Sequence, residues 1–166
     1  MPTLIKLQGG AMVLANDAFT HVDDDQDLPP GDVILSLTRF QREGDALLSD
    51  GRAVGVRLTT EEAVEALAYD LPRIALVALA FPKFRDGRHY SNARILRERY
   101  GFAREVRAVG DVLREQANFM LRCGIDAYEP ADGSTPAQWD AATHRYRHVY
   151  QRAADARTPA FVERGS

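Results

Sequence analysis

Apolar positions form short runs that recur regularly after residue 50, and each run is followed by a segment with helical spacing. Runs at residues 54–58 (VGVRL), 74–81 (IALVALAF), 105–109 (EVRAV) and 125–128 (IDAY) predict strands. The run at 74–81 has no polar alternation, which is typical of a parallel strand buried on both faces. Apolar residues three and four positions apart predict helices over residues 61–71, 92–100, 111–123 and 135–154.

Capping residues indicate where these helices begin and end. Ser91 is the expected N-cap of the second helix, because a hydroxyl can accept from the free N–H groups of a first turn, and Gly101 ends that helix. Asp111 is expected to open the third helix. The helical spacing of its apolar residues predicts that Phe119 of this helix faces the core. Pro136 marks the first turn of the last helix.

The first 50 residues have a different pattern. Residues 3–15 predict a hairpin around Gly9 and Gly10, residues 21–32 predict an exposed acidic linker, and residues 38–48 predict a helix after a short apolar run. We therefore divide the chain into an N-terminal β segment with its acidic linker (1–31), an α/β core domain (32–156) and a flexible tail (157–166).

Four consecutive βα units imply parallel strands joined by right-handed crossovers. The predicted fold is therefore an α/β half-barrel-like (βα)4 series, or a small open α/β sheet, preceded by a short β segment. Such a sheet has open edges that need cover. Either the N-terminal strands or a second copy of the chain supplies that cover, and a second copy makes the protein a homodimer.

Composition narrows the classes of function. The chain has 166 residues and a net charge of -3, which argues against general nucleic-acid binding. Its one cysteine excludes an intrachain disulfide and a cysteine-rich metal centre within one chain. No apolar run reaches the length of about 18 residues that a membrane span needs, and no secretory signal opens the chain, so we expect a cytoplasmic protein.

In parallel βα folds, functional groups collect where the βα loops meet at the carboxyl ends of the strands. That rule selects residues 57–60, 82–90, 110–112 and 129–134. Of these four regions, residues 82–90 carry the most charged side chains. The cations Arg85 and Arg88 stand next to Ser91 at a predicted helix start, which suits anion binding, although a solvated basic loop fits equally well. Asp86 and His89 are the candidate catalytic acid and base there; Asp86 as a turn residue and His89 as a surface residue are the alternatives.

Two further arginines lie inside predicted strands. Arg57 ends its strand, whereas Arg107 is in the middle of one, and a charge within a covered strand is costly unless it is paired. Each arginine either anchors an internal ion-pair network or points into an anion pocket. We favour the network for Arg107, with Asp126 or Glu115 as its partner rather than the sequence neighbour Glu105. Arg57 is the better anion ligand.

The chain carries none of the common cofactor signatures. There is no GxGxxG after a strand, no GxxxxGK[ST], no GxSxG and no HExxH, so no cofactor is predicted. His144 and His148 are four residues apart on the last helix, and residues 23–25 form an aspartate cluster. Neither is accompanied by a metal-site signature, and we predict no metal.

The runs at residues 55–58, 81–102 and 107–129 resemble an uncharacterised bacterial family, domain of unknown function 934. Its pattern F-x-x-F-x-D-G-R-x-Y-S falls on Phe81, Phe84, Asp86, Gly87, Arg88, Tyr90 and Ser91, whereas His89 stands where the pattern has Gly. Members carry the label of an oxidoreductase involved in sulfite reduction, and their genes tend to neighbour that of the sulfite reductase haem protein.

The resemblance implies an accessory protein of sulfite reduction and sulfate assimilation. It would act by binding sulfite reductase, or a small oxyanion through Arg57, Arg85, Arg88 and Arg107. One alternative is an enzyme on a βα scaffold, in which Asp86 or His89 transfers protons and arginines orient a small anionic substrate. Another is a redox protein whose dimer holds a cofactor that is not visible in the sequence.

Overall fold

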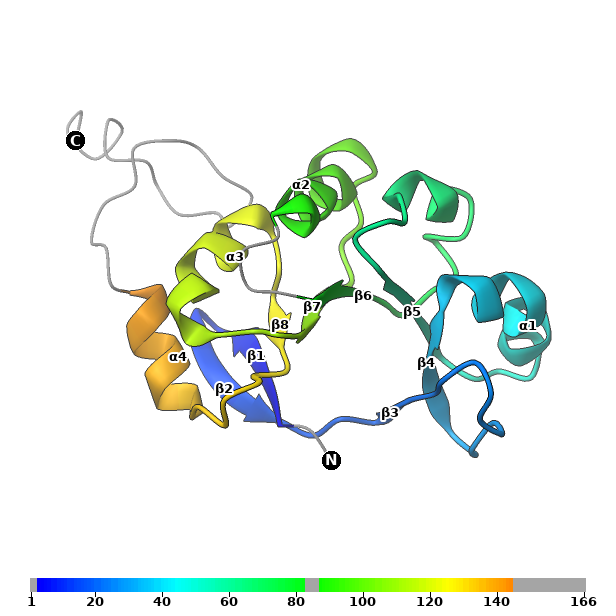
Figure 1. Cartoon of the computed structure of the whole chain (residues 1–166), viewed down its shortest axis with the longest axis horizontal. Coiled ribbons are helices and arrows are strands. Elements are labelled where there is room, and N and C mark those ends of the chain that lie inside the picture. The colour runs from blue at the N-terminus through cyan, green and yellow to red at the C-terminus, as the bar shows by residue number, and fades with distance from the viewer. Residues whose placement is uncertain (1–2, 83–86, 145–166) are drawn as a thin grey trace.

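The computed structural model describes residues 3–82 and 87–144 (Figure 1). One eight-stranded sheet runs through them in the order β2-β1-β8-β7-β6-β5-β4-β3. Its strands are β1 (Leu4–Gln8), β2 (Ala11–Ala15), β3 (Phe19–His21), β4 (Asp32–Ser36), β5 (Val54–Leu58), β6 (Leu76–Phe81), β7 (Glu105–Gly110) and β8 (Ala127–Tyr128).

The helices follow the parallel strands. They are α1 (Leu37–Ser49), the 3₁₀ helix η1 (Val64–Leu67), α2 (Arg88–Arg94) with the π-helical η2 (Ile95–Arg99), η3 (Arg114–Gln116) leading into α3 (Ala117–Cys123), and α4 (Pro136–Thr143). No helix in the described part of the chain is long and apolar enough to cross a membrane.

The strands β3 to β8 are parallel and neighbour one another in chain order, as in an opened βα barrel. The β1–β2 hairpin continues the sheet, with β1 antiparallel to both β2 and β8. The sheet curls (Figure 1), so the predicted half-barrel-like α/β fold is confirmed. The hairpin is also confirmed, and it is the N-terminal strand β1 that covers the β8 edge.

The two faces of the curled sheet differ in chemistry. The convex face is covered by helices and buries the large apolar cluster, to which the strands contribute Val33, Leu35, Val54, Val56, Leu58, Val77, Leu79, Val106 and Ala108. The concave face carries a small cluster of Ile34, Leu76, Ala78 and Val109. Below it the chain runs from β2 to β3 through residues 16–18 (Figure 1). Gly55 lies on this face, where a Cβ would come within 2.7 Å of Leu76.

Two predicted helices are shorter or begin elsewhere. The helix expected over residues 61–71 is only η1, although Val64 and Leu67 are buried as its pattern required. The prediction that Ser91 caps the next helix is wrong, because α2 begins at Arg88 and its first turn closes with a hydrogen bond from Tyr90 N–H to the carbonyl of Gly87. Ser91 is therefore an exposed residue inside α2.

The third helix begins at η3 and not at Asp111, whose N–H donates to the carbonyl of Phe81 and keeps the loop on β6. Phe119 is 52% exposed instead of facing the core. The predicted linker is also partly ordered into the sheet, since it begins in β3 at His21 and buries Val22. The last helix ends at Thr143 with His144 as its C-cap, and the predicted range beyond residue 144 and the predicted tail lie outside the described residues.

Candidate functional site

A network of charged side chains lies on the concave face beside the small apolar cluster, and Arg107 of β7 is at its centre. The guanidinium donates from Nη1 to Asp17 Oδ2 at 2.8 Å and to Glu129 Oε2 at 3.0 Å, and from Nε to Glu105 Oε2 at 2.8 Å. Lys6 of β1 reaches Glu105 from the other side, at 2.6 Å. Three carboxylates from three parts of the chain thus surround one arginine that is only 1% exposed.

Burial and pairing act in opposite directions on Arg107. Removal from water by itself lowers the pKa of the guanidinium, because burial disfavours a charged group. The hydrogen bond to Asp17 and the charges of Glu105 and Asp17 outweigh that effect and raise the pKa of Arg107 above its usual value. The ring of Phe19 lies 5.9 Å from the guanidinium carbon and adds a cation–π contact. Arg107 is therefore a permanent, buried cation.

The network extends through His21 to β3, the edge strand at the opposite side of the sheet from β2. His21 Nε2 lies 2.8 Å from Glu129 Oε2, and Arg57 Nη1 lies 3.3 Å from His21 Nδ1. An arginine can only donate, so His21 accepts at Nδ1 and donates from Nε2 to Glu129. The carboxylate that Arg107 holds therefore orients the imidazole, and the imidazole in turn faces Arg57.

Arg57 and His21 are the accessible end of this network. Their side chains are 22% and 26% exposed, and they lie at the carboxyl ends of β5 and β3. The acidic partner of Arg57 is Asp23, whose Oδ1 is 3.8 Å from Nη2 and whose side chain is 71% exposed. A pocket that borders His21 is lined also by Thr20, Val22, Gln26, Asp27 and Pro29. The network therefore meets a surface pocket at His21, while Arg57 is not among the residues that line this pocket.

The structure brings two of the predicted residues, Arg57 and Arg107, into one network. The network interpretation of Arg107 is confirmed, but its predicted partners are wrong. Glu105 is a partner after all, because residues two apart on a strand point to the same face. Asp126 instead pairs with Arg97 at 3.3 Å and accepts from the Val106 N–H, and burial raises its pKa.

The other predicted residues lie elsewhere. His89 is fully buried on the convex side, edge-on to Phe81 with ring centroids 5.4 Å apart, and is on the opposite face of the sheet from Arg107. Arg88 is at the surface, 2.9 Å from Glu61, and Ser91 is exposed on α2. Asp86 and Arg85 lie outside the described residues. The described part of the predicted loop therefore does not join the charged network.

Sequence reasoning missed three members of the network, Lys6, Asp17 and His21, and it placed Glu129 in a selected strand-end region without assigning it a role. The alternation of Phe19, Thr20 and His21 was a signal for a short strand that points His21 to the same face as Phe19. No local pattern marks Asp17 as a partner of a residue 90 positions away.

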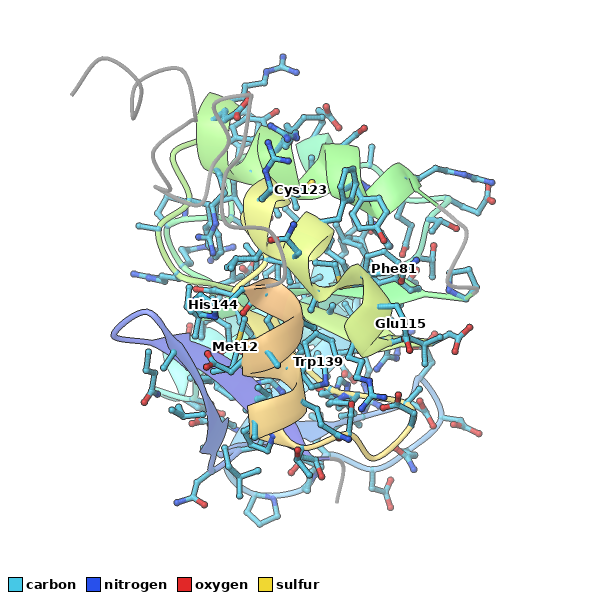
Figure 2. The ribbon with its side chains drawn as sticks, turned by 90° about the vertical axis from the view of Figure 1, so that its left-hand side faces the viewer. Met12, Phe81, Glu115, Cys123, Trp139 and His144 are labelled. Carbon is cyan, nitrogen blue, oxygen red and sulfur yellow. The ribbon has the colours of Figure 1, made fainter. Side chains whose placement is uncertain are left out.

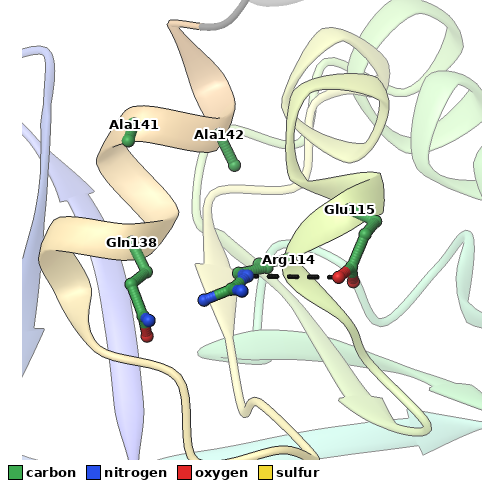
Figure 3. A pocket seen from close by; sticks show the side chains of 5 residues that line it. All are labelled: Arg114, Glu115, Gln138, Ala141 and Ala142. Atoms are coloured by element: carbon green, nitrogen blue, oxygen red, sulfur yellow. Dashed lines mark ion pairs between the residues drawn. The ribbon is translucent and has the colours of Figure 1, made fainter.

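A second polar site lies between η3 and α4 (Figure 3). Its lining residues are Arg114, Glu115, Gln138, Ala141 and Ala142. It adjoins two of the predicted loop regions, after β7 and after β8, which are tied together by a hydrogen bond from Ala131 N–H to the carbonyl of Val112. Helix α4, with Trp139 on it, also packs beside the hairpin residue Met12 (Figure 2).

Comparison with known families agrees with the sequence pattern. Residues 55–161 match the model of a family described as bacterial protein of unknown function, DUF934. The chain belongs to the DUF934 family. The match includes Arg57, Arg107 and Glu129, whereas Asp17 and His21 precede it. No curated protein matches the chain.

Proposed function

We propose that this DUF934 protein is a cytoplasmic accessory protein of sulfite reduction that acts by binding a small oxyanion, with Arg57 as the principal ligand. The sulfite reductase haem protein is the proposed partner. The link to sulfite rests on the label and gene neighbourhood of the family that the sequence resembles. The oxyanion site rests on the geometry around Arg57.

The state of Arg57 carries the proposal. Its guanidinium is partly exposed at a strand end, and its carboxylate partner Asp23 is 3.8 Å away and mostly in water. An oxyanion can replace such a partner without leaving a buried charge behind, and arginine binds oxyanions through two parallel N–H groups. Arg107, by contrast, is saturated by three carboxylates. We assign Arg107 to holding Glu129 and, through it, His21.

The test of this site is ligand binding measured by calorimetry and by thermal shift, with sulfite, sulfate and phosphate as probes. We expect sulfite to bind and Arg57→Gln to weaken binding on the order of tenfold or more, the loss expected for one charged hydrogen-bonding group. The matched control is Arg99→Gln, an exposed arginine 3.6 Å from Glu65 on the convex side. If no oxyanion binds, or if the two variants bind alike, the site is wrong.

The partner needs its own measurement. We expect the immobilised protein to retain the sulfite reductase haem protein from purified components, and Arg57→Gln to retain it less well in the presence of sulfite. Failure of the wild-type protein to retain the reductase would refute the proposed partner and leave the oxyanion site standing.

We propose further that the protein is a homodimer that pairs through the open edge of β2. That strand ends the sheet; α4 covers it at Met12, whose N–H donates to Asp140 Oδ1, but Leu14 further along the strand is 65% exposed. Native mass spectrometry is the measurement, and a mass of two chains is expected. A mass of one chain would refute the dimer. Added mass matching a flavin, a haem or a metal would instead support the redox alternative.

A specific observation favours an enzyme as the second candidate. His21 is oriented by Glu129 at 2.8 Å and lies beside Arg57, which is the arrangement of a general base next to an anion-binding cation. In that case Arg57 turns to the substrate and His21 Nδ1 accepts a proton. His21→Asn is then expected to abolish any turnover of a small anionic substrate while oxyanion binding persists; oxyanion binding by the wild-type protein without turnover would favour simple binding.

A further inference from the structure

The pocket between η3 and α4 is separate from the Arg57 site. Small side chains on α4 and charged side chains on η3 line it. Gln138, Ala141 and Ala142 are three and four positions apart, so they share the face of α4 that looks toward η3 (Figure 3). Two of the three are alanines, which leave the space between the helices open. Arg114 and Glu115 form the opposite wall.

Both walls are anchored to the core. On α4, Trp139 is fully buried, stacks on Tyr128 with ring centroids 4.6 Å apart, and donates to Ser134 Oγ at 2.7 Å. On the other side, the loop before η3 is held by the hydrogen bond from Ala131 N–H to the Val112 carbonyl. The backbone of both walls is therefore a preformed feature of the fold, whereas the side chains of Arg114 and Glu115, which are 39% and 63% exposed, are ordered at an entropic cost when a ligand binds.

The polar groups of the pocket are complementary to a ligand with two charges. Gln138 Oε1 accepts from the Thr135 N–H at 2.8 Å, so the helix cap uses the amide oxygen and not the two Nε2 hydrogens. The nearby Asp132 carboxylate is engaged by Ser134, whose hydroxyl is 2.6 Å away. Arg114 Nε and Glu115 Oε1 are 4.0 Å apart, the limit of an ion pair (Figure 3). Arg114 and Gln138 thus offer donors to an anion, and Glu115 offers an acceptor beside them.

We propose that this pocket binds a small zwitterion of the α-amino acid class. Arg114 and the Gln138 amide hold the carboxylate, Glu115 holds the ammonium group, and the methyl groups of Ala141 and Ala142 face a small side chain. A short ligand of this kind carries its two charges one carbon apart, so it can bridge a cation and an anion whose own ion pair is at its distance limit and is exposed to water.

The experiment is calorimetric titration of the full-length protein with L-alanine, propionate, ethylamine and sulfate. We expect L-alanine to bind on the order of tenfold more tightly than propionate, which lacks the ammonium group, and ethylamine and sulfate to bind more weakly still. Equal binding of L-alanine and propionate, preference for sulfate, or no binding of L-alanine would each overturn the proposal.

Three variants locate the ligand. Gln138→Glu is the sharpest, because a glutamate at this position still accepts from the Thr135 N–H and keeps the helix cap, while it replaces the donor by an anion. We expect Gln138→Glu and Arg114→Gln each to lower the affinity for L-alanine at least about tenfold. Glu115→Gln should abolish the preference for L-alanine over propionate, and an unchanged preference refutes the role of Glu115. Arg57→Gln is the control that leaves this pocket intact, so the two proposed sites fail or succeed independently.

Discussion

The convex and concave faces of one sheet are stabilised in different ways. On the convex face Val, Leu and Ile side chains pack against helices, and the residues need only be apolar and of suitable size. On the concave face a buried arginine needs three carboxylates at hydrogen-bonding distance. The opened barrel has no second half to fill its interior, and the segment leading into β3 supplies charges instead. The concave face therefore depends on particular partners, and it is there that a strand-end site opens to solvent.

Removing the central cation is expected to have the largest effect. Arg107→Met leaves Asp17, Glu105 and Glu129 without their common cation, and breaking a buried pair in this way costs about 3–5 kcal/mol. Chemical denaturation followed by circular dichroism measures the free energy of unfolding. Arg107→Lys, which keeps the charge but not the planar fork, is the control and should lose less. A loss below about 1 kcal/mol for Arg107→Met would show that the network contributes little.

Truncating a buried side chain tests the stability that apolar packing gives to the convex face. Leu79 is fully buried, and Leu79→Ala should lower the free energy of unfolding by about 2–5 kcal/mol through lost burial and the cavity left behind. Because the packing there is apolar and unspecific, Leu79→Met should cost less than about 1.5 kcal/mol. The same denaturation experiment measures both. Equal losses for Ala and Met would mean that the convex face is as specific in its contacts as the concave one.

Measuring stability at alkaline pH tests the burial of a polar group on the convex side, the phenol of Tyr90. Tyr90 lies edge-on to Phe119, with ring centroids 4.7 Å apart, and burial raises the pKa of its phenol from 10.0 to about 12. The folded state therefore favours the neutral phenol, so its contribution to stability is complete below the unfolded pKa of about 10 and is lost as pH rises through about 12.

The difference in tyrosinate absorbance between the wild-type protein and Tyr90→Phe should show a late step that belongs to Tyr90, and the variant should lose less stability at alkaline pH. Titration of every tyrosine near pH 10 in the folded protein would contradict the burial of this phenol.

The smallest effect is expected at a surface ion pair. Arg99 and Glu65 are 3.6 Å apart, and their side chains are 65% and 46% exposed. Arg99→Ala should change the free energy of unfolding by less than about 1 kcal/mol, because water screens such pairs. Thermal and chemical unfolding both measure it. A loss comparable to that of Arg107→Met would erase the distinction between buried and exposed charges on which the comparison depends.

Prediction from sequence succeeded where a pattern is local. The strand VGVRL has the predicted bounds, Val54–Leu58, because its alternation is a property of neighbouring residues. The helix ends were less well predicted. Gly87 and not Ser91 precedes α2, because the first turn closes through the hydrogen bond from Tyr90 N–H to the Gly87 carbonyl and needs no hydroxyl cap. For the candidate site, Arg57 and Arg107 were found because a charge in an apolar strand is conspicuous, whereas His21 lay in a segment expected to be a linker.

The sequence by itself determined the α/β class, the N-terminal hairpin and the alternating series of strands and helices from β5 to β8, because these follow from periodicities of two and 3.6 residues. It also determined that Arg107 needed a partner, since an unpaired buried charge is too costly. Only the tertiary structure decided which partners those are. The curl of the sheet brings Asp17, 90 positions away, and Glu129 onto the same guanidinium. A contact between residues so distant in sequence depends on how the whole sheet curls, and no local sequence pattern encodes that curl.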